Sequence, residues 1–148
     1  MEVEPPRVED DDLDLVVQLR TAITRLSRRL RQESLGAISP AQASALAMVS
    51  RLGSPTLGEL ARAEQIQPPT MTRLIAGMEE RGLVERASEP TDRRVVRITI
   101  TPTGRHELER IRQTKTAFLA RRLEGIPASQ RDQLPELVAF LEAIEIDR

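Results

Sequence analysis

Residues 82–104 read GLVERASEPTDRRVVRITITPTG, and this stretch decides the fold. Residues 83–86 and 95–101 both have strand character, and the second run alternates polar and apolar side chains as a strand with one buried face does. The charged residues 88–94 between them form a turn region. The stretch therefore predicts a two-stranded hairpin, which is only marginally stable unless another element supports it.

Two short helices are expected just before this hairpin. Residues 56–59, TLGE, have the spacing of a capping box and predict a helix that continues to about residue 64. Pro68 and Pro69 then interrupt the chain and can occupy the first turn of the next helix. That helix ends at Gly82 and has one apolar face, formed by Met71, Leu74, Ile75 and Met78.

A turn over residues 64–67 joins these two helices with the spacing of a helix-turn-helix. Because a hairpin follows, the sequence predicts a winged helix-turn-helix, which is a mainly α fold with a small β-hairpin wing and the layout of a DNA reader. We place this DNA-binding domain at residues 37–104. It includes a further helix, which Ser39 and Pro40 begin.

Helical extensions are predicted on both sides of this domain. Residues 13–35 carry an apolar stripe at helical spacing, and a long helix begins at Thr101 and Pro102. A final helix over about residues 129–144 contains Pro135, where we expect either a kink or the true start of the helix.

We assign residues 13–36 and 105–148 to a helical dimerisation region. Each terminal apolar stripe is wider than one small domain would bury, and pairing across a two-fold axis covers both stripes. The chain is therefore expected to be a homodimer with N- and C-terminal dimerisation helices. An intramolecular helix bundle is the alternative.

Charge is distributed unevenly along the 148 residues, whose formal net charge is -1. Residues 1–14 hold seven acidic residues and a single arginine, and the remainder then carries 21 basic and 16 acidic residues, about +5. We expect residues 1–12 to be a disordered acidic leader. The rest of the chain has the basic balance that favours double-stranded DNA as a partner.

Composition excludes several other classes of protein. The chain has no cysteine, so disulfides, thiolate zinc sites and cysteine nucleophiles are excluded, and His106 is the only histidine. We see no carboxylate pair placed for catalysis and therefore expect neither an enzyme nor a cofactor or metal. No run of about 18 apolar residues is present to span a membrane. The acidic N-terminus is also unlike a signal peptide, so we expect a cytoplasmic protein.

The hairpin carries a specific resemblance to a known family. Residues 82–86 (GLVER), 89–94 (EPTDRR) and 98–104 (ITITPTG) are similar to the wing signature of the MarR family, and the helix order extends the likeness over about residues 13–146. That family comprises small dimeric bacterial transcription regulators, many of them repressors that small molecules release. The resemblance implies a regulator of pseudo-palindromic operators. A ligand-independent DNA-binding or partner-binding protein of the same fold is the alternative.

The helix after the Pro68–Pro69 turn is the expected recognition helix, because such a helix presents its N-terminal residues to base edges. Its residues off the apolar face are Gln67, Pro68, Thr70, Thr72 and Arg73. Arg73 can read guanine with two hydrogen bonds and Gln67 can read adenine, whereas Thr70 can reach a phosphate or a thymine methyl group. The alternative is that Thr70 only stabilises the first helical turn and that Arg73 pairs with an acid such as Glu80.

Three residues at the tip of the hairpin form the candidate DNA-binding wing: Asp92, Arg93 and Arg94. Arginines enter narrow minor grooves because the negative potential is concentrated there. The family pattern implies that Arg94 is the inserted residue and that Asp92 orients the wing through charge pairing. The alternative is a solvated turn whose ion pairs contribute little.

An effector pocket is implied where the terminal helices of such regulators meet the DNA-reading domain. Here that junction comprises parts of residues 13–35, 41–48 and 105–118. A small anionic or phenolic effector would need cationic or polar partners there, and the candidates are Arg20, Arg28, His106 and Arg112. The alternative, which is the more common situation for such side chains, is a simple surface or interface position.

Overall fold

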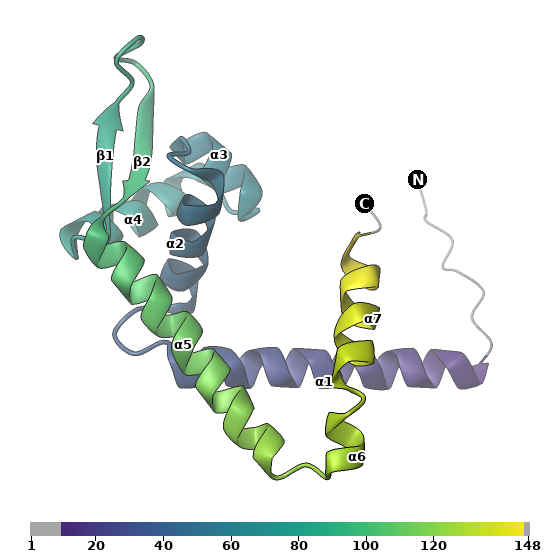
Figure 1. Cartoon of the computed structure of the whole chain (residues 1–148). Helices are drawn as coiled ribbons and strands as arrows, with labels where there is room; N and C mark the ends of the chain where they lie inside the picture. Colours follow the sequence, from purple (N-terminus) through teal and green to yellow (C-terminus); the bar gives the residue numbers. More distant parts are fainter. Residues whose placement is uncertain (1–9, 147–148) are drawn as a thin grey trace.

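The computed structural model describes residues 10–146 as a chain of helices with one β-hairpin (Figure 1). This is the mainly α architecture with a hairpin after a helix-turn-helix that the sequence predicts. The elements in chain order are α1 (Asp10–Ser34), α2 (Pro40–Leu52), α3 (Leu57–Ala63), α4 (Pro68–Glu80), β1 (Val84–Ser88), β2 (Val96–Ile100), α5 (Pro102–Glu124), α6 (Ala128–Arg131) and α7 (Leu134–Ile146).

Helices α2, α3 and α4 pack with the base of the hairpin and with Leu108 and Ile111 of α5 into one apolar core. We call helices α2 to α4 and the hairpin, residues 37–104, the reading lobe. The apolar face predicted for α4 lies in this core, since Met71, Ile75 and Met78 are fully buried. Ile98 of β2 is also fully buried. The hairpin is therefore supported by the helices at its base, which supplies the stability that an isolated hairpin lacks.

The helix starts of the reading lobe follow local capping signals. Ser39 and Gln42 form a capping box at α2, and Thr56 and Glu59 form one at α3. At the start of α5 the Thr101 hydroxyl accepts a hydrogen bond from the Gly104 amide at 3.0 Å. These side chains satisfy amides that a helix start otherwise leaves unpaired.

Gly104 is required where α5 crosses the hairpin. A Cβ atom at this position would lie 2.0 Å from the carbonyl oxygen of Leu83. No side chain fits at that distance, so α5 approaches the residue just before β1 through this glycine. The crossing fixes the direction in which α5 leaves the reading lobe.

Helices α1 and α5 pack against each other and form an arm below the reading lobe (Figure 1). The guanidinium of Arg110 on α5 joins them, because it donates to the carbonyl oxygens of Ser34 and Leu35 at the end of α1, at 3.1 and 3.4 Å. Glu107 accepts two hydrogen bonds from the same guanidinium. This arrangement lowers the pKa of Glu107 and raises the pKa of Arg110.

The N-terminal end of the chain differs from the sequence prediction, whereas the C-terminal end follows one of the two alternatives predicted at Pro135. Helix α1 begins at Asp10, not Leu13, so residues 10–12, which were predicted to be part of a disordered leader, are helical; residues 1–9 lie outside the described range. Acidic residues are favourable in a first helical turn, which explains the earlier start. The predicted final helix is two helices, α6 and α7, and α7 begins at Leu134 with Pro135 in its first turn.

Candidate nucleic-acid interface

Helix α4 has one buried face and one exposed face. The buried face carries the methionines and Ile75. The five residues predicted from the sequence to read DNA are all exposed: Gln67, Pro68, Thr70, Thr72 and Arg73. The five residues therefore lie together at the N-terminal end of this helix, which is the end that helix-turn-helix proteins direct at base edges.

The side chains on this face differ in how they are engaged. Gln67 is the N-cap residue of α4, yet its side chain makes no capping hydrogen bond. The Thr72 hydroxyl donates to the carbonyl oxygen of Pro68 at 2.9 Å. Among the ion pairs of residues 10–146 none involves Arg73 or Glu80. Gln67 and Arg73 thus keep their donors for a partner, whereas the hydroxyl proton of Thr72 is used within the helix.

The backbone at the start of α4 offers few donors. Pro68 and Pro69 have no N–H group, and the amides of Thr70 and Met71 both donate to the carbonyl oxygen of Gln67, at 2.9 and 3.1 Å. Helix N-termini commonly bind phosphate through free amides. Because those amides are missing or engaged here, contacts from this end of α4 must come from side chains.

The wing is the hairpin formed by residues 84–100. Its strands pair in an antiparallel register from Val84 with Ile100 to Ser88 with Val96. Beyond the last pair, the Glu89 amide donates to the Val95 carbonyl oxygen at 2.9 Å and so closes the loop. The wing points away from the arm formed by α1 and α5 (Figure 1).

Asp92 shapes the tip through the backbone. One of its carboxylate oxygens accepts a hydrogen bond from the Arg94 amide at 3.0 Å, and the Asp92 carbonyl oxygen accepts one from the Val95 amide at 2.9 Å. The family pattern implies charge pairing for Asp92, but none of the ion pairs in the described part of the chain includes it. Asp92 orients the tip as a turn residue instead.

Arg93 and Arg94 are exposed at the tip. Neither side chain takes part in an ion pair within residues 10–146. Two guanidinium groups on a projecting loop form a concentrated positive charge that suits a narrow, electronegative groove.

A cavity of about 430 Å³ lies where α1, α2 and α5 meet, at the junction that the sequence indicated. Of the four candidate effector residues only Arg112 lines it; Arg20, Arg28 and His106 are exposed elsewhere on these helices. Two further cationic side chains, Arg31 and Lys115, also line the cavity and were not singled out from the sequence. The lining is Ser27, Leu30, Arg31, Leu35, Pro40, Ala43, Ser44, Ala47, Leu108, Ile111, Arg112 and Lys115.

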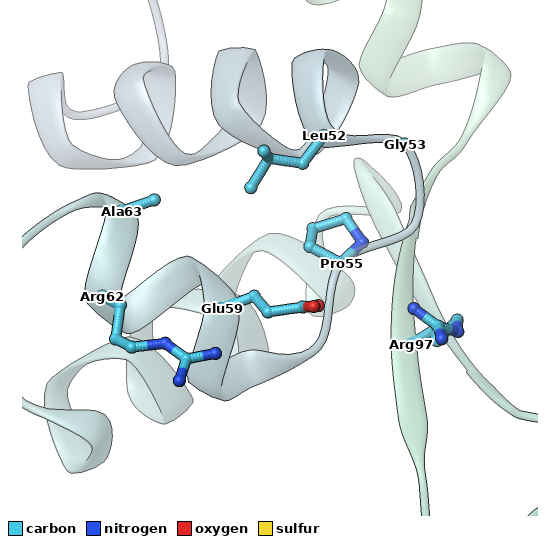
Figure 2. A pocket seen from close by; sticks show the side chains of 7 residues that line it. All are labelled: Leu52, Gly53, Pro55, Glu59, Arg62, Ala63 and Arg97. Carbon is cyan, nitrogen blue, oxygen red and sulfur yellow. The ribbon is translucent and has the colours of Figure 1, made fainter. Parts of the chain in front are cut away.

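A second cavity, of about 470 Å³, lies beside the turn between α2 and α3 (Figure 2). Glu59, Arg62 and Arg97 supply its charged groups. Glu59 is engaged in the capping box of α3, which lowers the pKa of its carboxyl group through the hydrogen bonds from Thr56. Arg97 was not singled out from the sequence, although it holds several parts of the reading lobe together.

Comparison with known proteins decides the family. Residues 38–96 match the MarR family, and an uncharacterized HTH-type transcriptional regulator of Mycobacterium bovis is 37% identical over 136 residues, covering 91% of this chain and 95% of that protein. The chain belongs to the MarR family.

Other similar proteins agree with this assignment. The HTH-type transcriptional repressor MdtR of Bacillus subtilis is 25% identical to this MarR-family chain, with 90% of each covered. The structure of a MarR family protein from Bacillus stearothermophilus superposes with a TM-score of 0.77 at 27% identity, covering 93% of this chain and 97% of that one. These relatives are transcriptional regulators and not enzymes, and this chain is accordingly a DNA-binding regulator.

The described part of this MarR-family protein, residues 10–146, contains no helix that is both long and apolar enough to cross a membrane.

Proposed function

We propose that this regulator is a homodimer that represses transcription from pseudo-palindromic operators and is released by a small anionic or phenolic effector. The observation that carries the proposal is the apolar surface of the terminal helices, which a single chain leaves uncovered. A second copy of the chain is the occupant that we infer for it. As a regulator of transcription it would act in the cytoplasm, where bacterial DNA is accessible.

The exposed apolar residues are concentrated at both ends of the described chain. On α1 six apolar residues are between 43% and 64% exposed: Leu13, Leu15, Val16, Val17, Ile23 and Leu26. On α7 four are between 46% and 57% exposed: Leu137, Val138, Phe140 and Ile144. Monomeric proteins rarely leave large apolar patches in water, and a partner surface would cover these ten side chains.

A two-fold axis through the terminal helices supplies that surface and also serves DNA binding. In a symmetric dimer the same patch of each copy is covered by the other. The two reading lobes then lie on opposite sides of the axis and can enter major grooves about one helical turn of DNA apart, which is the arrangement that a palindromic operator needs.

Each reading lobe is proposed to use α4 and the wing together. Arg73 has free guanidinium donors for guanine, Gln67 has a free amide for adenine, and Thr70 can contact a phosphate or a thymine methyl group. At the tip Arg94 is proposed to enter the flanking minor groove, with Arg93 against the phosphates. Pro68 and Thr72 lie on the same face and shape the contact surface.

The cavity between α1, α2 and α5 is the proposed effector site. Arg31, Arg112 and Lys115 give it positive charge, and its apolar lining would accept a small ring. Because α1 and α5 belong to the arm and α2 to the reading lobe, a ligand here contacts both parts. A ligand that binds one dimer geometry better than another would shift the distance between the reading lobes. Repression is proposed by analogy with MdtR, which is named a repressor.

Selection of bound fragments from a genomic DNA library tests the operator, and titration of the selected DNA with small aromatic carboxylates and phenols tests the release. We expect selected sites with two-fold symmetry. We also expect at least one compound that raises the melting temperature and weakens operator binding. Asymmetric sites bound by a monomer would refute the dimeric model. Symmetric sites with no response to any such compound would favour the ligand-independent alternative.

A further inference from the structure

The turn between α2 and α3 has an unusual backbone. Gly53 and Ser54 are consecutive residues with positive φ, +60° and +51°. Serine rarely adopts this region, so the surrounding contacts must hold it there. The turn brings the chain back alongside β2, where the Ile98 amide donates to the Pro55 carbonyl oxygen at 2.8 Å and Thr56 forms an isolated bridge with Arg97.

Arg97 extends from β2 to this turn and also toward the wing loop. One terminal nitrogen of its guanidinium, Nη1, donates to the Ser54 carbonyl oxygen at 3.1 Å, while Nε donates to the carboxylate of Glu89. The hydrogen bond and the negative charge of Glu89 raise the pKa of Arg97. Figure 2 shows the Arg97 side chain on its strand, at the edge of the cavity described above. One side chain therefore connects the α2–α3 turn with the loop of the wing.

From Glu89 the contacts continue to the tip. The Glu89 amide is bonded to Val95, and the Val95 amide is bonded to the Asp92 carbonyl oxygen. Asp92 in turn holds the amide of Arg94. A continuous series of hydrogen bonds thus runs from the turn of the reading lobe, through Arg97 and Glu89, to the backbone of Arg94.

The other ion pair of the hairpin does not reach the tip. Arg86 on β1 pairs with Glu79 at the end of α4, with 3.3 Å between the atoms. That contact holds the base of the wing against the recognition helix. It leaves the loop beyond Ser88 and Val96 to be positioned by Arg97 and Glu89.

We propose that Arg97 is a positioning residue that fixes the angle of the wing against α4 and so sets where Arg94 meets the minor groove. The proposal rests on the proposed role of Arg94 in reading DNA. Arg97 itself acts from within the protein, because its guanidinium is engaged by Ser54 and Glu89.

The first test is made on the free protein by hydrogen exchange. Arg97→Ala should speed exchange at the Val95 and Arg94 amides by about five-fold, as the loss of a partly exposed charge-assisted hydrogen bond implies. Arg97→Lys should behave similarly, because one ammonium group cannot span both partners. Arg86→Ala is the matched control, which removes the same charge from the same hairpin and should leave these two amides unchanged. Unchanged exchange in Arg97→Ala would overturn the proposal.

The second test is a double-mutant cycle between Arg97 and Arg94 on DNA. Operators with A·T-rich and G·C-rich flanks are compared at one salt concentration. Arg97→Ala should reduce the preference for A·T-rich flanks. The double variant should lose little more of this preference than Arg94→Ala loses alone. If the losses of flank preference in the two single variants add up in the double variant, Arg97 contacts DNA independently of Arg94, which would overturn the positioning role. If Arg94→Ala keeps the flank preference, the proposed minor-groove contact fails, while the exchange measurement still decides whether Arg97 holds the wing.

Discussion

Truncation of Phe140 on α7 tests the dimer most directly. This side chain is 52% exposed in the single chain. Complete burial of a phenylalanine side chain contributes about 1.5–3 kcal/mol, and about half of that remains to be gained in a dimer. A two-fold axis places two copies in the interface, so Phe140→Ala should weaken the dimer by about 2 kcal/mol. That free energy corresponds to a rise of roughly thirty-fold in the dimer dissociation constant.

Sedimentation equilibrium over a dilution series measures this constant. Leu52→Ala is the matched control, because Leu52 is 45% exposed on α2 in the reading lobe, away from the terminal helices. We expect Leu52→Ala to dimerise like the wild type. Equal dimer constants for both variants and the wild type would refute the reasoning and would favour an interface built on α1. A wild-type monomer that binds a full operator tightly would refute the dimer altogether.

Three further predictions concern single side chains. Arg94→Ala should weaken operator binding by more than about ten-fold at matched salt while the protein stays folded, as fluorescence anisotropy and circular dichroism can establish. Arg73→Ala should cost about 1–3 kcal/mol and relax selectivity at one base pair per half-site; an equal loss on unrelated DNA would mean a backbone contact only. Glu107→Gln should lower the free energy of unfolding by about 1 kcal/mol at neutral pH. Because Arg110 lowers the folded-state pKa of Glu107, this difference should disappear as the pH falls through that pKa, and a constant difference in thermal melts would contradict it.

The elements of the fold could be predicted because their signals are local. A cap such as Ser39 or Thr56 depends on a partner three residues away, and the sequence shows both partners at once. The exposed and buried faces of α4 follow from the helical period in the same way. The ends of the chain were harder, because the acidic residues before Leu13 and the proline in α7 each allow more than one helix boundary.

The candidate effector residues show the limit of choosing by residue type. Leu108, Ile111, Arg112 and Lys115 follow the helical spacing of one face of α5, and this face lines the cavity. His106 lies nearly opposite that face. Arg20 precedes Ser27 by seven residues, which is about 10 Å along α1 at the helical rise. A cavity lies at the predicted junction, but selecting the side chains that line it requires the period of each helix to be combined with the packing of three helices.

Arg97 could not be found from its own surroundings in the sequence. Alternation along β2 places it opposite the buried Ile98, where a two-stranded wing normally meets water, and the pattern therefore predicts an ordinary exposed arginine. Its acceptor, the Ser54 carbonyl oxygen, is 43 residues earlier in the chain. That oxygen reaches β2 because Gly53 and Ser54 both adopt positive φ. A glycine at the end of a helix predicts positive φ at Gly53, but nothing in the sequence predicts it at Ser54 as well. The contact depends on a turn and a strand meeting in space, and such a meeting is a property of the folded chain.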